Sequence, residues 1–430
     1  MTREKNLKIK QSIISTLKRR KSQTCHVFKV KIDYSKLNTK QKEQLKMVFV
    51  EAKWIYNMLL SKSETESLFE MSIAHFSTLK EVNHYDKDKK EVTSPLKYIS
   101  SQMKQSILRS MQSSIKTLSS LKKKGMPVGK LKYLSEYRSI NLQQYGITYS
   151  IVGKNKVKIQ KLGTFKVNGL KQIQSIEGIE IANAKLINSA SGYYIAITTF
   201  CPKKIEAKDK ALLGIDLGCK TTVTCSDGTT FDCKVEETER LKHLQRKLQD
   251  KKKGSNSYMK VKLMLKKEHE HIANKRVDKA NKIVASLKRY KIVMQDEQIS
   301  SWKDDASGTG RAKTIQHSCL GRIKSKLMQL EDTVVLDKWL PTTKICCNCG
   351  TIVEMTMKDR TFHCPKCGLS EDRDLHAAKN MLRMYNILAQ HFDGAKHQIV
   401  GVGCTDFKRL RKDTRQKIVS ALSKVEDTTL

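Results

Sequence analysis

Three short stretches near the end of the chain decide the fold: PTTKICCNCG at residues 341–350, TFHCPKCG at 361–368 and EDRDLHAAKNM at 371–381. The first two each hold a Cys-x-x-Cys pair followed by glycine. Such a pair bends the backbone into a knuckle that aims two thiolates at one point, and two knuckles complete a tetrahedral site. We therefore predict a structural zinc ribbon. Its expected ligands are Cys346, Cys349, Cys364 and Cys367.

Two further side chains of ligand type, Cys347 and His363, lie beside the knuckles. We interpret them as bystanders because four thiolates already fill a tetrahedral site and leave no opening for chemistry. The alternatives to zinc are two unrelated cysteine pairs or disulfides, and an intracellular setting disfavours disulfides. The cysteines outside this cluster are scattered, so we expect them to be small buried side chains.

The chain has 430 residues, with 83 lysines and arginines against 43 acidic residues, and its formal net charge is +40. Self-repulsion on this scale opposes folding, and a phosphate backbone relieves it through ion pairing and counterion release. We therefore predict a nucleic-acid partner, with a generically basic ribosomal or membrane-surface protein as the alternative. At roughly 100–200 residues per domain, the length predicts two or three domains.

The hydrophobic fraction of 39% is enough for packed cores. No segment reaches the ~18 uncharged apolar residues that a membrane span needs, because the most apolar stretch, residues 47–60, contains Glu51 and Lys53. The basic N-terminal segment lacks the apolar core of a secretory signal. We expect a cytoplasmic protein without a membrane partner, associated with the nucleoid in a prokaryote.

The first half of the chain opens with HVFKVKIDY at residues 26–34, where apolar and charged residues alternate and Tyr34 falls on the apolar face. This pattern predicts a half-buried strand with a basic outer face. Asn38 and Gln41 are spaced as a capping pair, so a helix is expected to follow.

Ser94-Pro95 has the form of a helix start, and we predict that it opens a long amphipathic helix ending at residues 122–124. The polar stretch before it, residues 61–93, receives no assignment. Short strands broken by glycine are expected over residues 139–200. The first half is thus mixed α and β, and it contains no catalytic constellation.

The second half begins with LLGIDLG at residues 212–218, an apolar run that predicts a buried strand, and a hairpin is expected over residues 221–233. Two basic helices separated by KKKGSNS at residues 251–257 are expected to form an antiparallel pair. Two more strands are predicted at residues 291–294 and 334–337.

Three acids stand out in this strongly basic chain: Asp216 within LLGIDLG, Glu297 at the end of KIVMQDE, and Asp374 within EDRDLHAAKN. Acids at strand ends and helix starts are suitable ligands for Mg²⁺, which prefers hard oxygen atoms. Each acid also has a plainer interpretation. An aspartate before glycine often forms a turn, the IDLG string occurs in phosphate-binding ATPases, and Asp374 could stabilise a helix dipole.

The order of these parts resembles the split RuvC-like nuclease of the TnpB family, the transposon-encoded RNA-guided nucleases. Compact type V CRISPR effectors share this layout. The ribbon and the EDRDLHAAKNM string resemble the family's zinc ribbon leading into its third RuvC motif. Further support comes from GIDLG at 214–218, the KGSNS break, IQHSCLGRIKSKL at 315–327 and KWIYN at 53–57.

The resemblance implies an α/β multidomain protein: an RNase H-like (RuvC) nuclease core with a zinc ribbon, and an N-terminal wedge-like β-barrel with an inserted helical lobe. It implies a guide RNA and target double-stranded DNA as partners, and a site for two Mg²⁺ ions on Asp216, Glu297 and Asp374. The expected parts are a wedge and helical recognition region at 1–205, the first nuclease part at 206–341, the ribbon at 342–370, the last nuclease motif at 371–390 and a basic tail at 391–430.

One departure from the family concerns the second metal-binding acid. The family more often has Glu-Asp-Leu where this chain has Gln295-Asp296-Glu297. Strand alternation would point Gln295 and Glu297 to the same side, so Glu297 could supply the ligand from one step further on. If Gln295 holds the family position instead, the site lacks an anion and the protein binds DNA without cutting it. Asp296 and Asp372 are reserve ligands.

The leading hypothesis is an Mg²⁺-dependent, RNA-guided DNA endonuclease. The alternatives are a nuclease-dead relative that acts as an RNA-guided DNA-binding repressor, and a basic zinc-ribbon RNA-binding factor. A DNA-strand transposase is disfavoured because the sequence shows no tyrosine in a His-x-His setting and no other recombinase site.

Nucleic-acid contacts are expected from two lysine runs, which could equally be solvated surface. They are Lys122, Lys123, Lys124, Lys251, Lys252 and Lys253. Trp54 and Tyr56 could stack on bases, or could pack in a core. The basic segment at 408–417 could be disordered.

Overall fold

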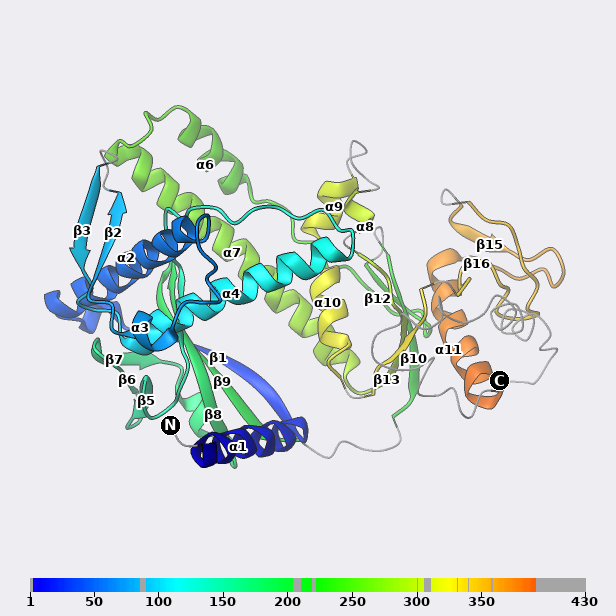
Figure 1. Ribbon diagram of the computed structural model, residues 1–430. Coiled ribbons are helices and arrows are strands. Elements are labelled where there is room, and N and C mark those ends of the chain that lie inside the picture. The colour runs from blue at the N-terminus through cyan, green and yellow to red at the C-terminus, as the bar shows by residue number, and fades with distance from the viewer. Residues whose placement is uncertain are drawn as a thin grey trace. The chain divides into compact units, whose positions relative to one another are not determined.

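The computed structural model describes residues 3–85, 90–203, 210–218, 222–299, 301–304, 311–330, 332–338, 340–356 and 359–391. The chain divides into two compact units, Met1–Ile205 and Glu206–Leu430. Both are drawn in Figure 1, and each is described by itself. The basic segment at 408–417 lies outside the described residues.

The first unit is built on a seven-stranded sheet in the order β4-β8-β9-β1-β7-β6-β5. All its pairings are antiparallel. The two edge strands are joined by a turn in which the Thr148 N–H donates to the Gln144 carbonyl at 2.9 Å. Because this short turn brings the edges together, the sheet curls into a nearly closed barrel. The strands are β1 (Gln23–Ile32), β4 (Ser139–Leu142), β5 (Tyr149–Val152), β6 (Lys156–Ile159), β7 (Gly163–Asn168), β8 (Glu180–Ser189) and β9 (Gly192–Pro202).

Strand β1 has the predicted alternation, with Val30 and Ile32 buried. It ends at Ile32, and a 3-10 helix, η1 (Tyr34–Lys36), follows. Tyr34 was expected on the buried face and is instead 48% exposed, because the turn rotates its side chain away from the sheet.

A helical lobe is inserted between β1 and β4, and its first long helix begins where the sequence predicted. The Asn38 side chain accepts from the Gln41 N–H at 2.8 Å, and the Gln41 side chain accepts from the Asn38 N–H at 3.2 Å. The helices and the small hairpin of this unit are α1 (Arg3–Lys21), α2 (Thr39–Lys62), α3 (Ile73–Ser77), β2 (Glu81–Tyr85), β3 (Glu91–Pro95), α4 (Ser101–Lys123) and α5 (Lys171–Gln174).

The predicted helix start at Ser94-Pro95 is wrong. These two residues end strand β3, and α4 is capped instead by Ser100, whose side chain accepts from the Met103 N–H. Ser-Pro suits a strand end as well as a helix start, since proline disfavours helical backbone at the residue before it. The capping serine, Ser100, lies six residues after Ser94.

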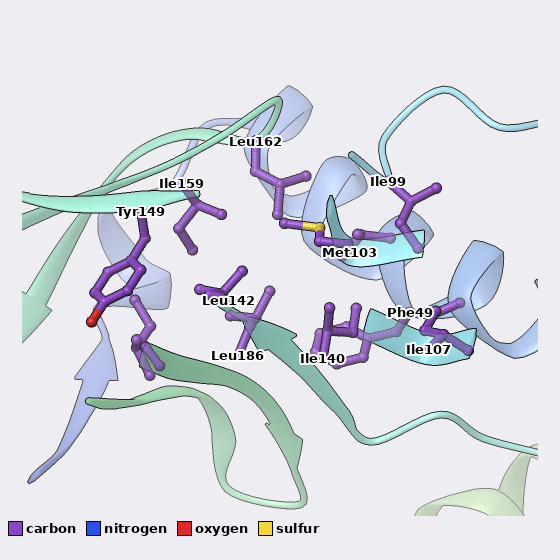
Figure 2. Packing of buried hydrophobic residues seen from close by; sticks show 14 of the residues in the cluster. Phe49, Ile99, Met103, Ile107, Ile140, Leu142, Tyr149, Ile159, Leu162 and Leu186 are labelled. Carbon is purple, nitrogen blue, oxygen red and sulfur yellow. The ribbon is translucent and has the colours of Figure 1, made fainter. Parts of the chain in front are cut away.

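The core of the first unit lies between the inserted helices and the sheet (Figure 2). Met103 and Ile107 from α4 point toward Ile140 and Leu186 from the sheet, and all four are at most 1% exposed. Burial of each such side chain contributes roughly 1.5–3 kcal/mol. The helical lobe and the barrel are therefore one folding unit.

The second unit contains a five-stranded sheet in the order β12-β11-β10-β13-β14. Strands β10, β11 and β12 form an antiparallel meander, whereas β13 and β14 run parallel to β10. The strands are β10 (Leu212–Leu217), β11 (Val223–Cys225), β12 (Thr230–Phe231), β13 (Lys291–Gln295) and β14 (Val334–Leu336). The predicted hairpin and both predicted later strands are confirmed.

Helices α6 (Glu239–Gln249) and α7 (Asn256–Leu287) connect β12 to β13 and pack against each other, as predicted for an antiparallel pair (Figure 1). The remaining helices are α8 (Ser301–Asp304), α9 (Arg311–His317), α10 (Leu320–Leu327) and α11 (Arg373–His391). A small hairpin of β15 (Thr361–His363) and β16 (Ser370–Asp372) leads directly into α11, which packs on β10 and β13.

Candidate active site

Asp216 lies near the end of β10, the central strand of the second sheet. It pairs with Thr224 of β11 on one side, and β13 runs beside β10 on the other. Its strand neighbours Ile215 and Leu217 are 0% and 5% exposed, and Asp216 itself is half-buried. The rigid centre of the sheet therefore fixes the position of this acid.

Helix α11 crosses β10 so closely that a Cβ atom on Gly214 would lie 2.1 Å from the Ala378 carbonyl oxygen. Residues two apart on a strand share a face, so Asp216 lies on the Gly214 side of β10. Residues four apart on a helix also share a face, so Asp374 lies one turn before Ala378 on the same side of α11. This close contact brings Asp216 and Asp374 together.

Glu297 reaches the same place after a turn rather than along a strand. Strand β13 ends at Gln295, and the Glu297 N–H donates to the Gln295 carbonyl at 2.9 Å. The premise that strand alternation continues to Glu297 is therefore wrong, since this tight turn redirects the backbone. The half-buried Glu297 carboxylate nevertheless acts electrostatically on Asp216.

The three acids share one electrostatic environment. Burial raises the pKa of the Asp216 carboxyl to about 7, and the Asp374 and Glu297 carboxylates add to this rise. Arg373 and the Leu217 N–H oppose it. A buried carboxylate beside two others is unfavourable in its charged form unless a cation joins them.

Glu297 has cationic neighbours as well. Burial raises the pKa of its carboxyl, Lys324 and Lys338 lower it, and Asp296 raises it. The Lys324 ammonium donates to Asp296 Oδ1 at 2.5 Å and to the Glu297 carbonyl at 2.7 Å. Asp296, a reserve ligand in the sequence analysis, is therefore paired with α10 in this structure.

Gln295 is occupied by backbone groups. Its Nε2 donates to the Asp337 carbonyl at 2.9 Å and the Leu340 carbonyl at 2.8 Å, and its Oε1 accepts from the Thr342 hydroxyl at 3.1 Å. The residue is only 4% exposed. Its amide anchors the loop between β14 and the ribbon.

Asp372, the other reserve ligand, caps α11. Its Oδ1 accepts from the Asp374 N–H at 2.9 Å and the Leu375 N–H at 3.1 Å. This cap places Asp374 in the first turn of α11 and satisfies two backbone donors that the helix leaves open.

The side chains of Asp216, Glu297 and Asp374 are of the type that binds divalent cations such as Mg²⁺. All their donor atoms are carboxylate oxygens, which Mg²⁺ prefers, and they come from three separate elements. A cation would also relieve the repulsion that raises the pKa of Asp216.

The four cysteines expected in the ribbon lie together. Cys346 and Cys367 have their Sγ atoms 3.5 Å apart, as do Cys349 and Cys364, and all four Sγ atoms lie within 4.8 Å of one another. Thiolates on one tetrahedral zinc ion are about 3.8 Å apart, given Zn–S bonds of about 2.3 Å. The cluster could therefore hold a zinc ion, consistent with a zinc ribbon.

Cys347 is outside that cluster and contacts an acidic side chain instead. Its Sγ lies 3.3 Å from Glu371 Oε1, which is also 2.8 Å from His376 Nδ1. The Lys379 ammonium donates to the other oxygen of Glu371. Cys347, His376 and Lys379 all contact the Glu371 carboxylate, so we assign this group of side chains to the contact between the ribbon and α11.

Sequence reasoning missed the roles of Gly214 and His376. Gly214 lies inside the quoted GIDLG string, but its need for a missing Cβ becomes visible only once α11 is placed over β10. His376 is 0% exposed and contacts the ribbon. Its signal was a lone histidine two residues after Asp374, which has many plainer explanations.

The expected nucleic-acid contacts have mixed outcomes. The lysines at 122–124 lie at the end of α4, and those at 251–253 lie in the loop between α6 and α7. Lys251 is half-buried and the other five are exposed. Trp54 stacks on His84 with ring centroids 4.1 Å apart, and Tyr56 packs against the core of the first unit. Both aromatic rings therefore serve packing in this structure, whereas phosphate binding by the lysines stays a prediction.

Two protein-family models match the chain. Residues 322–381 match the Cas12f1-like TNB domain, and residues 199–298 match the OrfB_IS605 family, described as a probable transposase. The first match covers the ribbon and Asp374, and the second covers Asp216 and Glu297. No helix in the described part of the chain is long and apolar enough to cross a membrane.

Curated relatives carry related names. The chain is 29% identical over 189 residues to a "putative RNA-guided DNA endonuclease" of Streptomyces pristinaespiralis, covering 40% of this chain and 44% of the relative. It is 26% identical over 251 residues to the "putative RNA-guided DNA endonuclease InsQ" of Escherichia coli, covering 53% and 61%. A "TnpB-like protein" of Acanthamoeba polyphaga mimivirus is 28% identical over 221 residues, covering 45% and 41%.

The chain thus spans about half the length of the curated relatives it matches. A chain of a solved "Cas12f1-sgRNA-target DNA complex" aligns with 80% of this chain and 81% of its own length, at 13% identity and a TM-score of 0.38. The family models and the TnpB-like relatives confirm the resemblance seen in the sequence.

Proposed function

We propose that this chain is an RNA-guided DNA endonuclease that hydrolyses phosphodiester bonds at Asp216, Glu297 and Asp374. One observation carries the proposal. Helix α11 packs so closely on β10 at Gly214 that Asp374 lies beside Asp216, and Glu297 follows the end of the neighbouring strand β13, where it acts on Asp216 electrostatically. In a chain of net charge +40 this group of acids stands out, and a divalent cation that joined the carboxylates would relieve their repulsion.

We also propose that the second unit is an RNase H-like core. The order β12-β11-β10-β13-β14, a three-stranded meander extended by two parallel strands, supports this assignment. The positions of the acids, near the ends of β10 and β13 and at the start of the helix packed on β10, also support this assignment. The ribbon between β14 and α11 is then an insertion in the nuclease.

The three carboxylates would hold two Mg²⁺ ions. Bound Mg²⁺ would activate the attacking water and stabilise the leaving oxygen. The sheet holds Asp216 rigidly, Asp372 fixes the start of α11 for Asp374, and Lys324 holds the backbone carbonyl of Glu297. Arg373 acts on Asp216 as a nearby positive charge.

The hydrogen bonds of Gln295 favour an active nuclease over the nuclease-dead alternative. A residue whose amide binds two backbone carbonyls and a threonine hydroxyl has a structural use in this position. The third carboxylate of the site would then be that of Glu297. The nuclease-dead repressor remains the second candidate because the family more often has an acid at this position.

The partners would be a guide RNA and target double-stranded DNA, as the names of two relatives suggest for those proteins. The barrel and inserted helices of the first unit would bind the guide and its heteroduplex, with base pairing reading the target sequence. The lysine runs at 122–124 and 251–253 would contact phosphates, and the ribbon would hold structural zinc.

The test is to purify the chain from its host, sequence the RNA that accompanies it, and offer DNA matched to that RNA in Mg²⁺. We expect a discrete guide and cleavage of matched DNA only. Asp250→Asn, which removes an exposed carboxylate of the same unit, is expected to leave cleavage unchanged. Matched DNA that is bound but stays intact would contradict the nuclease and support the repressor.

A further inference from the structure

Helix α11 has two working faces. Ala378 and Met381 lie against the sheet and its core, on the side that carries Asp374. His376, Asn380 and Arg383 point the other way, to the ribbon. One rigid helix therefore joins the cysteine cluster to the acidic site.

The ribbon is held through the backbone that carries Cys346. His376 Nε2 lies 2.8 Å from the Ile345 carbonyl, and Asn380 Nδ2 donates to that carbonyl at 2.6 Å. Arg383 donates to the Cys346 carbonyl itself. These contacts depend on the shape of the first knuckle, which a metal ion bound to its thiolates would fix.

His376, like Asn380, is completely buried in this contact. It is 0% exposed, and the ring of Phe362 in β15 stacks on it with centroids 3.6 Å apart and an interplanar angle of 10°. Its Nδ1 lies 2.8 Å from Glu371, just before the Asp372 cap. The imidazole thus touches both strands of the ribbon region and the segment that sets the start of α11.

We propose that His376 is a positioning residue that couples metal binding in the ribbon to the placement of Asp374. A metal ion bound to the four cysteines of the ribbon fixes the position of the Ile345 carbonyl. This carbonyl and the ring of Phe362 then fix the His376 side chain. His376 in turn fixes the first turn of α11 against β10. The inference rests on the proposed function, since it takes Asp374 as a ligand of the catalytic cation. Occupancy of the ribbon would then set the affinity of the acidic site for a divalent cation.

The probe is Fe²⁺ in place of Mg²⁺, with ascorbate and hydrogen peroxide, which cuts a polypeptide beside the bound ion. The purified full-length protein is titrated with Fe²⁺, and fragments cut near Asp216 and Asp374 are quantified while its zinc content is measured. His376→Leu should need about tenfold more Fe²⁺ for half-maximal cutting, within the usual range of coupling. It should keep its zinc, and His376→Gln, whose amide can still donate to Ile345, should recover most of the loss.

Removal of zinc from the wild-type protein should produce the same shift, and removal from His376→Leu should add little. Lys366→Ala, on the exposed surface of the ribbon, is the matched control and should titrate like the wild type. If His376→Leu folds poorly, Arg383→Met breaks the neighbouring contact to Cys346 and should give a smaller shift in the same direction.

Two results distinguish failure of the coupling through His376 from failure of the proposed acidic site. A His376→Leu protein with full zinc, a native melting temperature and wild-type Fe²⁺ dependence overturns the coupling and leaves the nuclease assignment intact. Wild-type protein that is not cut near Asp216, or an Asp374→Asn variant that is cut like the wild type, removes the proposed acidic site itself.

Discussion

The backbone of Gly214 lies against the carbonyl of Ala378, so that a single added carbon on Gly214 would come within 2.1 Å of that oxygen. This approach lets α11 lie directly on β10, and it places Asp374 beside Asp216.

Gly214→Ala is therefore expected to displace α11. Overpacking costs about 1–3 kcal/mol or more, because the obstacle is backbone and cannot rotate away. We expect a lower melting temperature and at least about a tenfold loss of DNA cleavage, the latter because misplacement of catalytic groups by an ångström is this costly. Gly321→Ala in α10 is the control: nothing lies within 4 Å of its Cβ, so stability should rise slightly. Equal behaviour of the two variants would contradict the packing argument.

Asp216 should make the metal-free protein less stable as pH rises. Its folded pKa of about 7 lies above the ordinary value of 3.8, so the folded state binds the proton more tightly than the unfolded state. The stabilisation from this proton is present below about pH 4 and is lost as pH rises toward 7. Asp216→Asn should remove this loss and be more stable at pH 8 by up to roughly 4 kcal/mol in Mg²⁺-free buffer.

Added Mg²⁺ should raise the melting temperature of the wild type at pH 8 and leave that of Asp216→Asn nearly unchanged. Thermal unfolding at a series of pH values, with and without Mg²⁺, measures both effects. Parallel pH profiles for the two proteins would show that the Asp216 carboxyl does not cause the loss of stability at high pH.

Gln295→Glu separates the two interpretations of the second acid. In the native chain the Gln295 amide donates to the carbonyls of Asp337 and Leu340. The substitution restores the acid of the family, but it points a carboxylate at these two carbonyls. Loss of both hydrogen bonds and burial of a charge should destabilise the protein by at least about 2 kcal/mol without raising cleavage. Glu297→Gln should instead abolish cleavage with little change in melting temperature. Increased cleavage by Gln295→Glu would favour the nuclease-dead interpretation of the native chain.

Glu51 tests the first unit. Its carboxylate is 1% exposed and accepts from the backbone N–H groups of Lys97, Tyr98 and Ile99 at 2.8–3.1 Å. Glu51→Ala leaves these donors unsatisfied and should cost at least about 3 kcal/mol. Chemical denaturation measures the loss, and Glu43→Ala, on the exposed side of the same helix, should change stability by less than about 0.5 kcal/mol. A small effect of Glu51→Ala on stability would mean that the hydrogen bonds between α2 and residues 97–99 do not stabilise the first unit.

Local signals predicted much of this structure. The Cys-x-x-Cys pairs, the Asn38–Gln41 capping box and the hairpin after β10 are written in a few adjacent residues, and each formed as expected. Ser94-Pro95 failed because a strand end and a helix start share this local signal, and only the packing of α4 selects Ser100 as the cap.

The candidate site was less accessible from sequence because its geometry is long-range. Asp216 could be found from its apolar strand, but the turn that brings Glu297 to it depends on the end of β13. Gly214 and His376 acquire their roles only through contacts with Ala378 and Ile345. No periodicity encodes such pairs.

The central claim is that the acids around Asp216 bind the cation that cuts DNA. The most direct test is the single-turnover cleavage rate of a guide-matched duplex in Mg²⁺, for wild type and Asp216→Asn, with DNA binding measured in parallel. We expect the wild type to cut, and we expect Asp216→Asn to bind the duplex equally well but to cut at least about a thousandfold more slowly, as loss of a catalytic group commonly does. Cleavage by Asp216→Asn at the wild-type rate would contradict this claim.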